Sequence, residues 1–469
     1  MNLDRSRSAE EIAVSAGSPA SKSDREIERR TLRKAGWRLL PLLSICYAVA
    51  FVDRANVSYA ALQMNRDLHF NAAVYGFGAS VFFISYAVCE LPANYLLLKF
   101  GARRWIARIM LTWGVLAAAA MFVRTPVSFY VLRFLLGMAE AGFFPGVLYY
   151  LSLWFPQEMR SRAISRFYVA FPLANVLMGL FAGSLLGLNG RFGLRGWQWL
   201  FLVEALPALV LGGVVLFTLP DGPETARWLK PEERLWLLER LLRDRREIGG
   251  LSRRHVGLLS VLGDARVMLV GFFFLLTLGS SYAFSFSGPQ IFTAITGWSA
   301  GRVGFLLAAM SLVGAAAMQI VAWISDRQRV RLPWIVGLSL VMALGFLVSG
   351  VARSPWIVVP AVSVAMVSFY GLEAPALSLI TTFLEGPAAA MGIAAINTLA
   401  IIGGFLGPNW IGWSITRTGD WRWGLGLLSV PCALGAVLML WFRQVQVRSV
   451  AGSGRGLRPD EPEAVATIP

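Results

Sequence analysis

Four ionisable residues fall inside stretches of apolar sequence that are long enough to cross a membrane. Asp53 and Arg54 are adjacent in the first stretch, and Arg133 and Glu140 share the fourth. A charge at the centre of a bilayer costs about 2.5–3.5 kcal/mol on insertion scales, so such residues usually face a cavity and mark a path for a substrate or for protons. An arginine offers fixed positive charge to an anion, whereas a carboxylate can take up and release a proton. The four residues together predict a proton-coupled site for an organic anion.

The spacing of these residues indicates which way they point. Arg133 and Glu140 are seven residues apart, so on one helix they share a face and lie about 10.5 Å apart along the axis. We therefore expect both to face a central cavity, although Arg133 is close enough to the start of its span to extend toward the membrane surface instead. Asp53 and Arg54 point about 100° apart on a helix. One of them can hold a ligand while the other contacts a neighbouring helix.

The composition is that of an integral membrane protein. The chain has 469 residues, 56% of them hydrophobic and 15% charged, whereas a soluble domain averages about 25% charged. Stretches of about 20 apolar residues, the length that crosses a hydrocarbon core, predict an all-α membrane protein. Twelve such spans are expected, at 37–59, 73–97, 105–123, 128–151, 163–187, 198–219, 267–292, 303–324, 332–351, 355–380, 390–414 and 423–442.

The spans fall into two halves of six helices, which we expect to surround a central cavity. The expected divisions are an N-terminal tail (1–36), a first half (37–219), a linker (220–266), a second half (267–442) and a C-terminal tail (443–469). In the linker, Pro231 is a suitable first helical residue, and Leu235, Leu238 and Leu242 recur at helical spacing. This pattern predicts one amphipathic helix.

The distribution of basic residues predicts the orientation. Most Lys and Arg residues flank spans on the side of the N-terminus, so the positive-inside rule predicts that both termini lie in the cytoplasm. We expect the chain to cross the inner (cytoplasmic) membrane of the cell several times. The segment before Trp37 has no apolar core and is not a signal peptide. The net charge of +16 therefore reflects topology, and no nucleic-acid partner is expected.

A basic loop follows the second span of each half. Arg103 and Arg104 lie in the first loop, and Asp326 and Arg327 in the second. Matching loops in two six-helix halves are typical of transporters whose halves rock about a site near the midplane, which makes these four residues candidates for a gate. The alternative is that these loops have no gating role and are basic only because cytoplasmic loops in general are basic.

Several motifs stand in a fixed order along the chain. They are FVDRAN at 51–56, ELPAN at 90–94, GARRW at 101–105, RFLLGMAEAGFFPG at 133–146, the linker run at 220–233, and Asn397 followed by Gly403, Gly404, Gly407 and Pro408. In this order they resemble the major facilitator superfamily, and within it the anion:cation symporter family, which includes tartrate, galactonate and hydroxyphenylacetate permeases. The resemblance extends from about residue 37 to 442. The first loop departs from the superfamily signature, since Leu98 stands where many members carry an acid.

The resemblance implies roles for the matching residues. Arg54 would hold a substrate carboxylate, Asp53 and Glu140 would be the proton-coupling carboxylates, and Arg133 would be their charge partner or a second anion contact. Tyr86 and Asn397 would be neutral substrate contacts, although Tyr86 could equally be an aromatic packed between helices.

Other polar residues inside spans leave two interpretations open. Gln290 and Asn175 could bind substrate hydroxyls, or they could join helices through their amides. Glu90 lies near the end of its span, which favours a gate contact, and Glu373 could be a cavity residue or a gate partner. If Phe51, Phe171 and Phe286 face the cavity, they favour an aromatic or less hydroxylated acid.

The sequence favours a transporter over an enzyme. Cys46, Cys89 and Cys432 lie in apolar spans and indicate no disulfide framework, His69 and His255 are isolated, and no P-loop is present. We expect no metal or other cofactor. The expected partners are a small carboxylate, protons and the lipid bilayer, with the protein a monomer. The first alternative is a proton:drug antiporter of the same fold, which two arginines in the cavity would disfavour. The second is a membrane sensor that binds the anion without moving it. An intramembrane enzyme is the least favoured.

Overall fold

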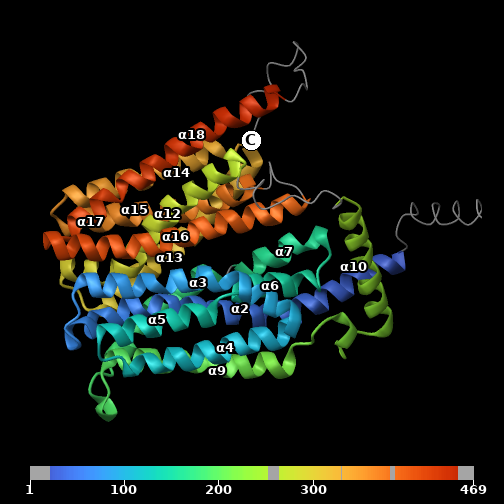
Figure 1. The fold of residues 1–469 in the computed structure, drawn as a ribbon, viewed down its shortest axis with the longest axis horizontal. Helices are drawn as coiled ribbons and strands as arrows, with labels where there is room; N and C mark the ends of the chain where they lie inside the picture. The colour runs from blue at the N-terminus through green and yellow to red at the C-terminus, as the bar shows by residue number, and fades with distance from the viewer. Residues whose placement is uncertain (1–21, 169, 252–262, 329, 381–385, 453–469) are drawn as a thin grey trace, which may run out of the picture.

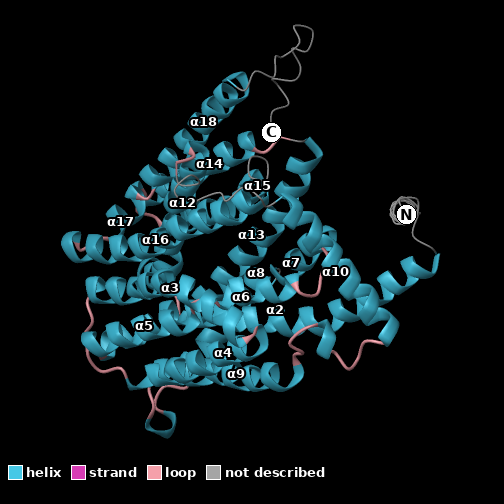
Figure 2. Ribbon diagram, turned by 45° about the vertical axis from the view of Figure 1, so that its right-hand side comes forward, coloured by secondary structure: helices cyan, strands magenta, loops and turns pink. Residues whose placement is uncertain are grey.

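The computed structural model describes residues 22–168, 170–251, 263–328, 330–380 and 386–452, and within these ranges every regular element is a helix (Figures 1 and 2). Twelve helical segments are long and apolar enough to cross a membrane. Helices satisfy their own backbone hydrogen bonds, which a segment surrounded by lipid requires. The all-α membrane fold predicted from the apolar spans is confirmed.

Eight helices make up the first half. They are α2 (Lys22–Asp67), α3 (Ala72–Phe100), α4 (Ala102–Ala119), α5 (Pro126–Glu140), α6 (Phe143–Ser152), α7 (Gln157–Tyr168), α8 (Ala170–Leu186) and α9 (Gly196–Thr218). The second half comprises α12 (Ala265–Thr296), α13 (Ala300–Gln328), α14 (Leu332–Val351), α15 (Pro355–Ile380), α16 (Gly386–Thr418), α17 (Trp421–Leu427) and α18 (Ser429–Gly452). Buried apolar side chains form two clusters, one in each half. The halves meet where α3 packs against α16, α8 against α13, and α2 against α12.

The first helix is longer than the sequence indicates. It begins at Lys22 and not near residue 37, so the last part of the expected N-terminal tail is helical. The added segment is charged and contacts the linker helix α10 (Pro231–Leu251), which begins at Pro231 as its sequence predicts (Figure 1). We call the end of the bundle that carries α10 the linker end, and the opposite end, where α2 turns into α3, the far end.

The fourth span is broken in its middle. Helix α5 ends at Glu140 and α6 begins at Phe143, with Gly142 between them at φ 84°. A Cβ atom at Gly142 would lie 2.7 Å from the Cβ of Ala93, so both the positive φ and the close approach of α3 require glycine. The break places Glu140 at the carboxyl end of a helix inside the membrane-spanning region.

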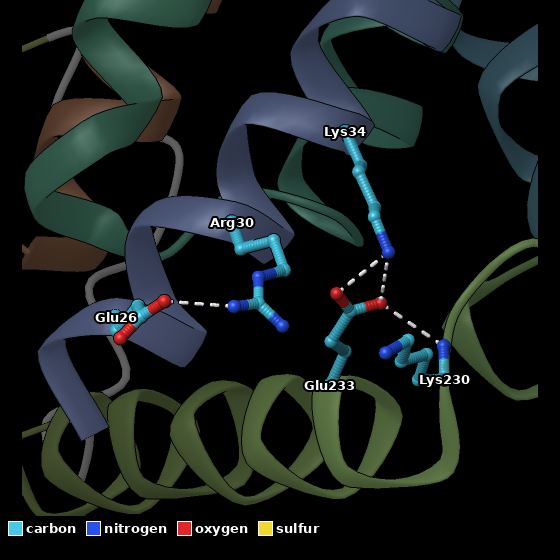
Figure 3. Close-up of polar contacts among 5 residues, drawn as sticks. All are labelled: Glu26, Arg30, Lys34, Lys230 and Glu233. Carbon is cyan, nitrogen blue, oxygen red and sulfur yellow. Dashed lines mark hydrogen bonds and ion pairs between the residues drawn. The ribbon is translucent and has the colours of Figure 1, made fainter. Parts of the chain in front are cut away.

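An ion pair holds the linker helix against the first helix (Figure 3). The Lys34 ammonium donates hydrogen bonds to both oxygens of Glu233, at 2.7 and 2.8 Å, and the backbone N–H of Lys230 donates to Glu233 Oε2 at 3.0 Å. The Glu233 side chain has no exposed surface. Nearby, the Arg38 guanidinium lies 5.3 Å from the centre of the Trp228 ring. These contacts make α10 part of the first half.

The ion pair predicts a pH-dependent contribution to stability. Burial opposes ionisation of Glu233, but the hydrogen bonds from Lys34 and from the Lys230 backbone outweigh it and hold the pKa of Glu233 below its ordinary value. A lowered pKa stabilises the docked helix above the unfolded pKa of about 4.3, and the contribution is lost as the pH falls through the folded pKa. Glu233→Gln is therefore expected to weaken docking by about 1–2 kcal/mol at neutral pH.

The measurement is thermal unfolding of the purified protein at a series of pH values. The wild type should unfold at a higher temperature than Glu233→Gln near pH 7, and the difference should shrink below about pH 4. Glu232→Gln, at the exposed neighbouring position, is the matched control and should behave as wild type. An equal difference at every pH would contradict the assignment.

Candidate functional site

A central cavity of about 220 Å³ lies between the two halves. Its charged lining residues are Arg54 from the first half, Glu90 from α3 and Glu373 from α15. Aromatic side chains make up much of the remaining wall; they are Tyr47, Phe51, Tyr59, Phe82, Phe83, Tyr86, Phe144, Tyr168, Phe171, Tyr282, Phe284, Phe286, Phe369 and Tyr370. A pocket with apolar walls and a few polar groups is typical of a site for a small organic molecule.

Arg54 and Glu140 form an ion pair in the wall of this cavity. The Arg54 Nε and Nη2 atoms each lie 2.7 Å from Glu140 Oε1. The guanidinium carbon also lies 5.1 Å from the centre of the Phe51 ring and 5.0 Å from that of Tyr86, within the range of cation–π attraction. The Arg54 side chain is 16% exposed, whereas that of Glu140 is completely buried. A ligand in the cavity can therefore contact Arg54 directly and affects Glu140 through it.

The position of Glu140 makes its charge depend on Arg54. Glu140 is the last residue of α5, and the carboxyl end of a helix carries a partial negative charge that disfavours a carboxylate. Its second oxygen, Oε2, is buried and has no hydrogen-bond partner among the described residues. The Arg54 guanidinium is the group that offsets these costs.

Asp53 and Arg133 are not among the residues that line the central cavity. Asp53 is 2% exposed and accepts a hydrogen bond of 3.2 Å from Asn56. Both Asp53 and Arg133 line a second, much smaller cavity inside the first half. The Arg133 guanidinium lies 4.8 Å from the centre of the Phe82 ring, and that of Arg54 lies 5.6 Å from it. The divergence expected of Asp53 and Arg54 is observed.

The expectation that Arg133 faces the central cavity does not match this arrangement. Arg133 is 3% exposed and donates a hydrogen bond of 3.5 Å to the Ala79 carbonyl, so it does not extend to the membrane surface either. It shares a helix face with Glu140, but α3 packs against α5, and the Arg133 guanidinium lies against the Phe82 ring and lines the second cavity instead of the central one. Glu140 does not line the central cavity either, and it is connected to the cavity wall through its ion pair with Arg54.

The neutral candidates occupy two different places. Tyr86 and Asn397 line the central cavity, and Asn397 Nδ2 donates to Glu90 Oε1 at 3.3 Å. Asn175 also lines the cavity. Gln290 lies instead at the far end, where its Oε1 accepts a hydrogen bond of 3.2 Å from Asn65.

The two basic loops make separate contacts. Arg103 forms an ion pair of 3.0 Å with Asp221 at the start of the linker. Arg327 lies 5.3 Å from the centre of the Trp323 ring, and Arg104 and Asp326 are exposed. Among the described residues, no hydrogen bond or ion pair joins these two loops.

The far end of the cavity is closed by contacts between the halves. Besides Asn65 and Gln290, the Tyr75 hydroxyl donates to the Phe286 carbonyl at 2.6 Å, and the Ala73 N–H donates to Thr416 at 2.9 Å. Pairs of glycines let backbones of opposite halves touch. We call these pairs the glycine seam; they are Gly76 with Gly412, Gly179 with Gly304 and Gly183 with Gly301. At the linker end, by contrast, the lining residue Asn397 is exposed. The cavity is therefore open toward the linker end.

Sequence reasoning missed one acid of the membrane-spanning region. Glu204 on α9 is 8% exposed, lies beside Asn56, and has a buried oxygen, Oε2, without a hydrogen-bond partner among the described residues. The signal was present, because Glu204 is an acid within the apolar span at 198–219.

Comparisons with known proteins agree with this arrangement. The family model of the Major Facilitator Superfamily matches residues 43–408. A protein of Agrobacterium vitis described as a "Putative tartrate transporter" is 42% identical over 88% of this chain and 92% of its own length. A "Quinolone resistance transporter" of Acinetobacter baumannii is 38% identical over 88% of this chain and 95% of its own length.

Solved structures show the same fold. A bacterial homologue of the human lysosomal transporter Spinster, in an inward-facing and occupied conformation, superposes with a TM-score of 0.71 at 14% identity, covering 87% of this chain and 96% of its own. The xylose transporter of E. coli, in a partially occluded inward-open conformation, gives a TM-score of 0.67 at 14% identity, with 87% of this chain and 98% of that one covered. The chain belongs to the Major Facilitator Superfamily and is a multi-pass membrane transporter, not an enzyme.

Proposed function

We propose that the protein takes up a small organic anion together with a proton across the cytoplasmic membrane by alternating access. The observation that carries this proposal is the ion pair of Arg54 with Glu140 in the cavity wall. The guanidinium that would bind a substrate carboxylate is already held by a carboxylate that can be protonated. Proton and substrate can therefore influence each other through a single arginine.

The coupling follows from competition for Arg54. When Glu140 is ionised, it holds Arg54 and opposes binding of an anion. When Glu140 takes up a proton, the guanidinium is released from its strongest partner and can bind the substrate carboxylate through charge-assisted hydrogen bonds. A proton gradient drives transport only if the affinity for the substrate differs between the protonated and the ionised state of the carrier. Asp53 and Arg133 form a second buried acid and base, and Asp53 is the other candidate proton carrier.

The expected orientation in the membrane determines which side of the membrane the cavity opens to. Since the basic residues place the termini and linker in the cytoplasm, a cavity open toward the linker end is open to the cytoplasm. In this orientation Gln290 belongs to the outer gate and Asn397 to the inner mouth of the cavity. The description of the Agrobacterium vitis relative as a "Putative tartrate transporter" supports an organic anion as the substrate.

Drug export coupled to proton entry is the second candidate function. It is favoured by the Acinetobacter baumannii relative, which is named for quinolone resistance. The two functions differ in the direction of net movement. An uptake symporter accumulates substrate on the side to which protons flow, whereas an antiporter moves its substrate the opposite way.

The deciding experiment uses the purified protein in liposomes. Uptake of radiolabelled tartrate and of aromatic carboxylates would be measured with an inward proton gradient, without a gradient, and with a protonophore. Gradient-dependent accumulation of at least one of these carboxylates, abolished by the protonophore, is the expected result. Expulsion of a preloaded quinolone by the same gradient, without carboxylate uptake, would replace the proposal with drug export.

The glycine seam provides a test of alternating access. A Cβ atom at Gly304 would overlap the backbone of Gly179, and overpacking of this kind costs about 1–3 kcal/mol. Gly304→Val should therefore keep the far end open and lower uptake about tenfold or more. The same change at Gly213, where the described structure leaves space for a Cβ atom, is the matched control.

The conformational effect can be read from labelling of a cysteine introduced at Asn65 at the far end. Cys89, the partly exposed native thiol, would first be replaced by serine. Gly304→Val should react faster with an impermeant maleimide added at the far end than the Gly213→Val control. Equal labelling with normal uptake would show that the seam does not have to close tightly.

A further inference from the structure

The second half contributes one acidic residue to the wall of the central cavity. Glu373 on α15 is 9% exposed, and its Oε2 atom is buried without a hydrogen-bond partner among the described residues. A buried polar group without a partner is costly, and a buried carboxylate more so. Its position in a cavity wall suggests that a ligand supplies the missing partner.

The charges of the wall are unbalanced. Arg54 is the lining residue that carries a positive charge, and it already contacts Glu140, whereas Glu90 and Glu373 are both acids. Glu90 has a partner in Asn397, at 3.3 Å. Glu373 therefore remains as the acid in the cavity whose buried oxygen lacks a partner within the described ranges.

Glu373 and Arg54 line the cavity from different halves, because α15 belongs to the second half and α2 to the first (Figure 1). The hydroxyl groups of Tyr168 and Tyr282 interact electrostatically with both of them. The Tyr370 ring, next to Glu373 in the same helix, has its centre 6.0 Å from that of Phe171. An acid among aromatic rings is an arrangement that favours a cation, through ion pairing and cation–π attraction together.

We infer that the substrate is an aromatic monocarboxylate carrying a protonated nitrogen at the end remote from its carboxylate, with Arg54 binding the carboxylate and Glu373 the nitrogen. The inference rests on the proposed function, since it assumes that Arg54 holds the carboxylate. It narrows that function in one respect: a dicarboxylate would bring its second negative charge against Glu373, and such like-charge contact selects against a ligand. The aromatic wall would pack against the ring of the substrate.

Four benzoates of nearly the same shape test this assignment. They are 4-(aminomethyl)benzoate, with a cationic end; 4-(hydroxymethyl)benzoate, with a neutral donor; 4-methylbenzoate, with an apolar end; and terephthalate, with a second carboxylate. Binding of each to the purified protein would be measured by isothermal titration calorimetry near pH 7. The wild type should bind the aminomethyl compound about tenfold or more tighter than the methyl compound, and terephthalate most weakly.

Glu373→Gln should remove this preference by weakening the binding of 4-(aminomethyl)benzoate, and Glu373→Ser is the second variant. Size-exclusion profiles and melting temperatures would establish that each variant is folded. Glu90→Gln, at the other acid of the wall, should keep the preference for the aminomethyl compound. If Glu90→Gln abolishes the preference and Glu373→Gln keeps it, the assignment to Glu373 is overturned.

The ranking in the wild type is decisive even without the variants. If terephthalate binds as tightly as the aminomethyl compound, or if the hydroxymethyl compound binds tightest, Glu373 does not select a cation and the inference is overturned. If all four carboxylates bind equally, the inference fails while the anion site at Arg54 stands. If none of the four binds, both the inference and the proposed anion site fail.

Discussion

Replacing Arg54 with lysine is expected to lower the rate of uptake about 100-fold or more while leaving the protein folded. The guanidinium contacts Glu140 through Nε and Nη2, and its planar fork has further N–H groups for a substrate carboxylate. A lysine keeps the charge, but its single ammonium cannot hold both partners in the same geometry. Loss of two charge-assisted hydrogen bonds, at about 1.5 kcal/mol each, corresponds to a factor of about 100.

The measurement is uptake kinetics in liposomes, with folding checked by size exclusion and melting temperature. Arg66→Lys is a matched control, because Arg66 lies on the same helix and its contact with the Leu62 carbonyl is exposed. It should transport as wild type does. If a well-folded Arg54→Lys protein has wild-type kinetics, Arg54 does not bind the substrate.

Replacing Glu140 with glutamine is expected to separate substrate binding from proton coupling. Glutamine resembles the protonated acid in shape and charge, so Arg54 should be permanently available to the substrate. Exchange of substrate at equal pH on both sides should stay within a few-fold of wild type, since no net proton movement is needed. Accumulation against a gradient should be lost, because a group that no longer titrates cannot link the two fluxes.

Both activities would be measured on the same liposome preparation, with Asp53→Asn as the comparison variant. If Glu140→Gln accumulates substrate as well as wild type does, Glu140 is structural and Asp53 becomes the leading proton carrier. If exchange is lost together with accumulation, Glu140 is needed for binding or folding, and its coupling role has no support.

The helical framework could be predicted because lipid leaves few choices. An apolar stretch that crosses a bilayer must satisfy its own backbone, so hydropathy and length were sufficient to find the spans. The start of α10 at Pro231 also follows from local chemistry, since proline suits the first helical position. The extension of α2 back to Lys22 was missed, because its charged sequence becomes helical against α10 and lacks the apolar signal of a span.

The partners within the site could be predicted only in part. The spacing of Asp53 and Arg54 correctly predicted that their side chains point in different directions, because both residues are on one helix. It could not show that Glu140 would pair with Arg54, 86 residues away, since helical periodicity contains no information about which helix packs alongside. The closeness of the Phe82 ring to both Arg54 and Arg133 depends on the packing of α3 in the same way.

The docking of α10 offers a way to watch the transporter move. Because Lys34 and Glu233 tie α10 to the first helix, a fluorescent dye on α10 would report the position of the first half without being attached to a membrane-embedded segment. The exposed side chain of Leu242 on α10 and that of Gln444 on α18 provide one attachment point in each half. Energy transfer between two such dyes would change each time the linker end opens or closes, so single molecules could be followed through successive transport cycles.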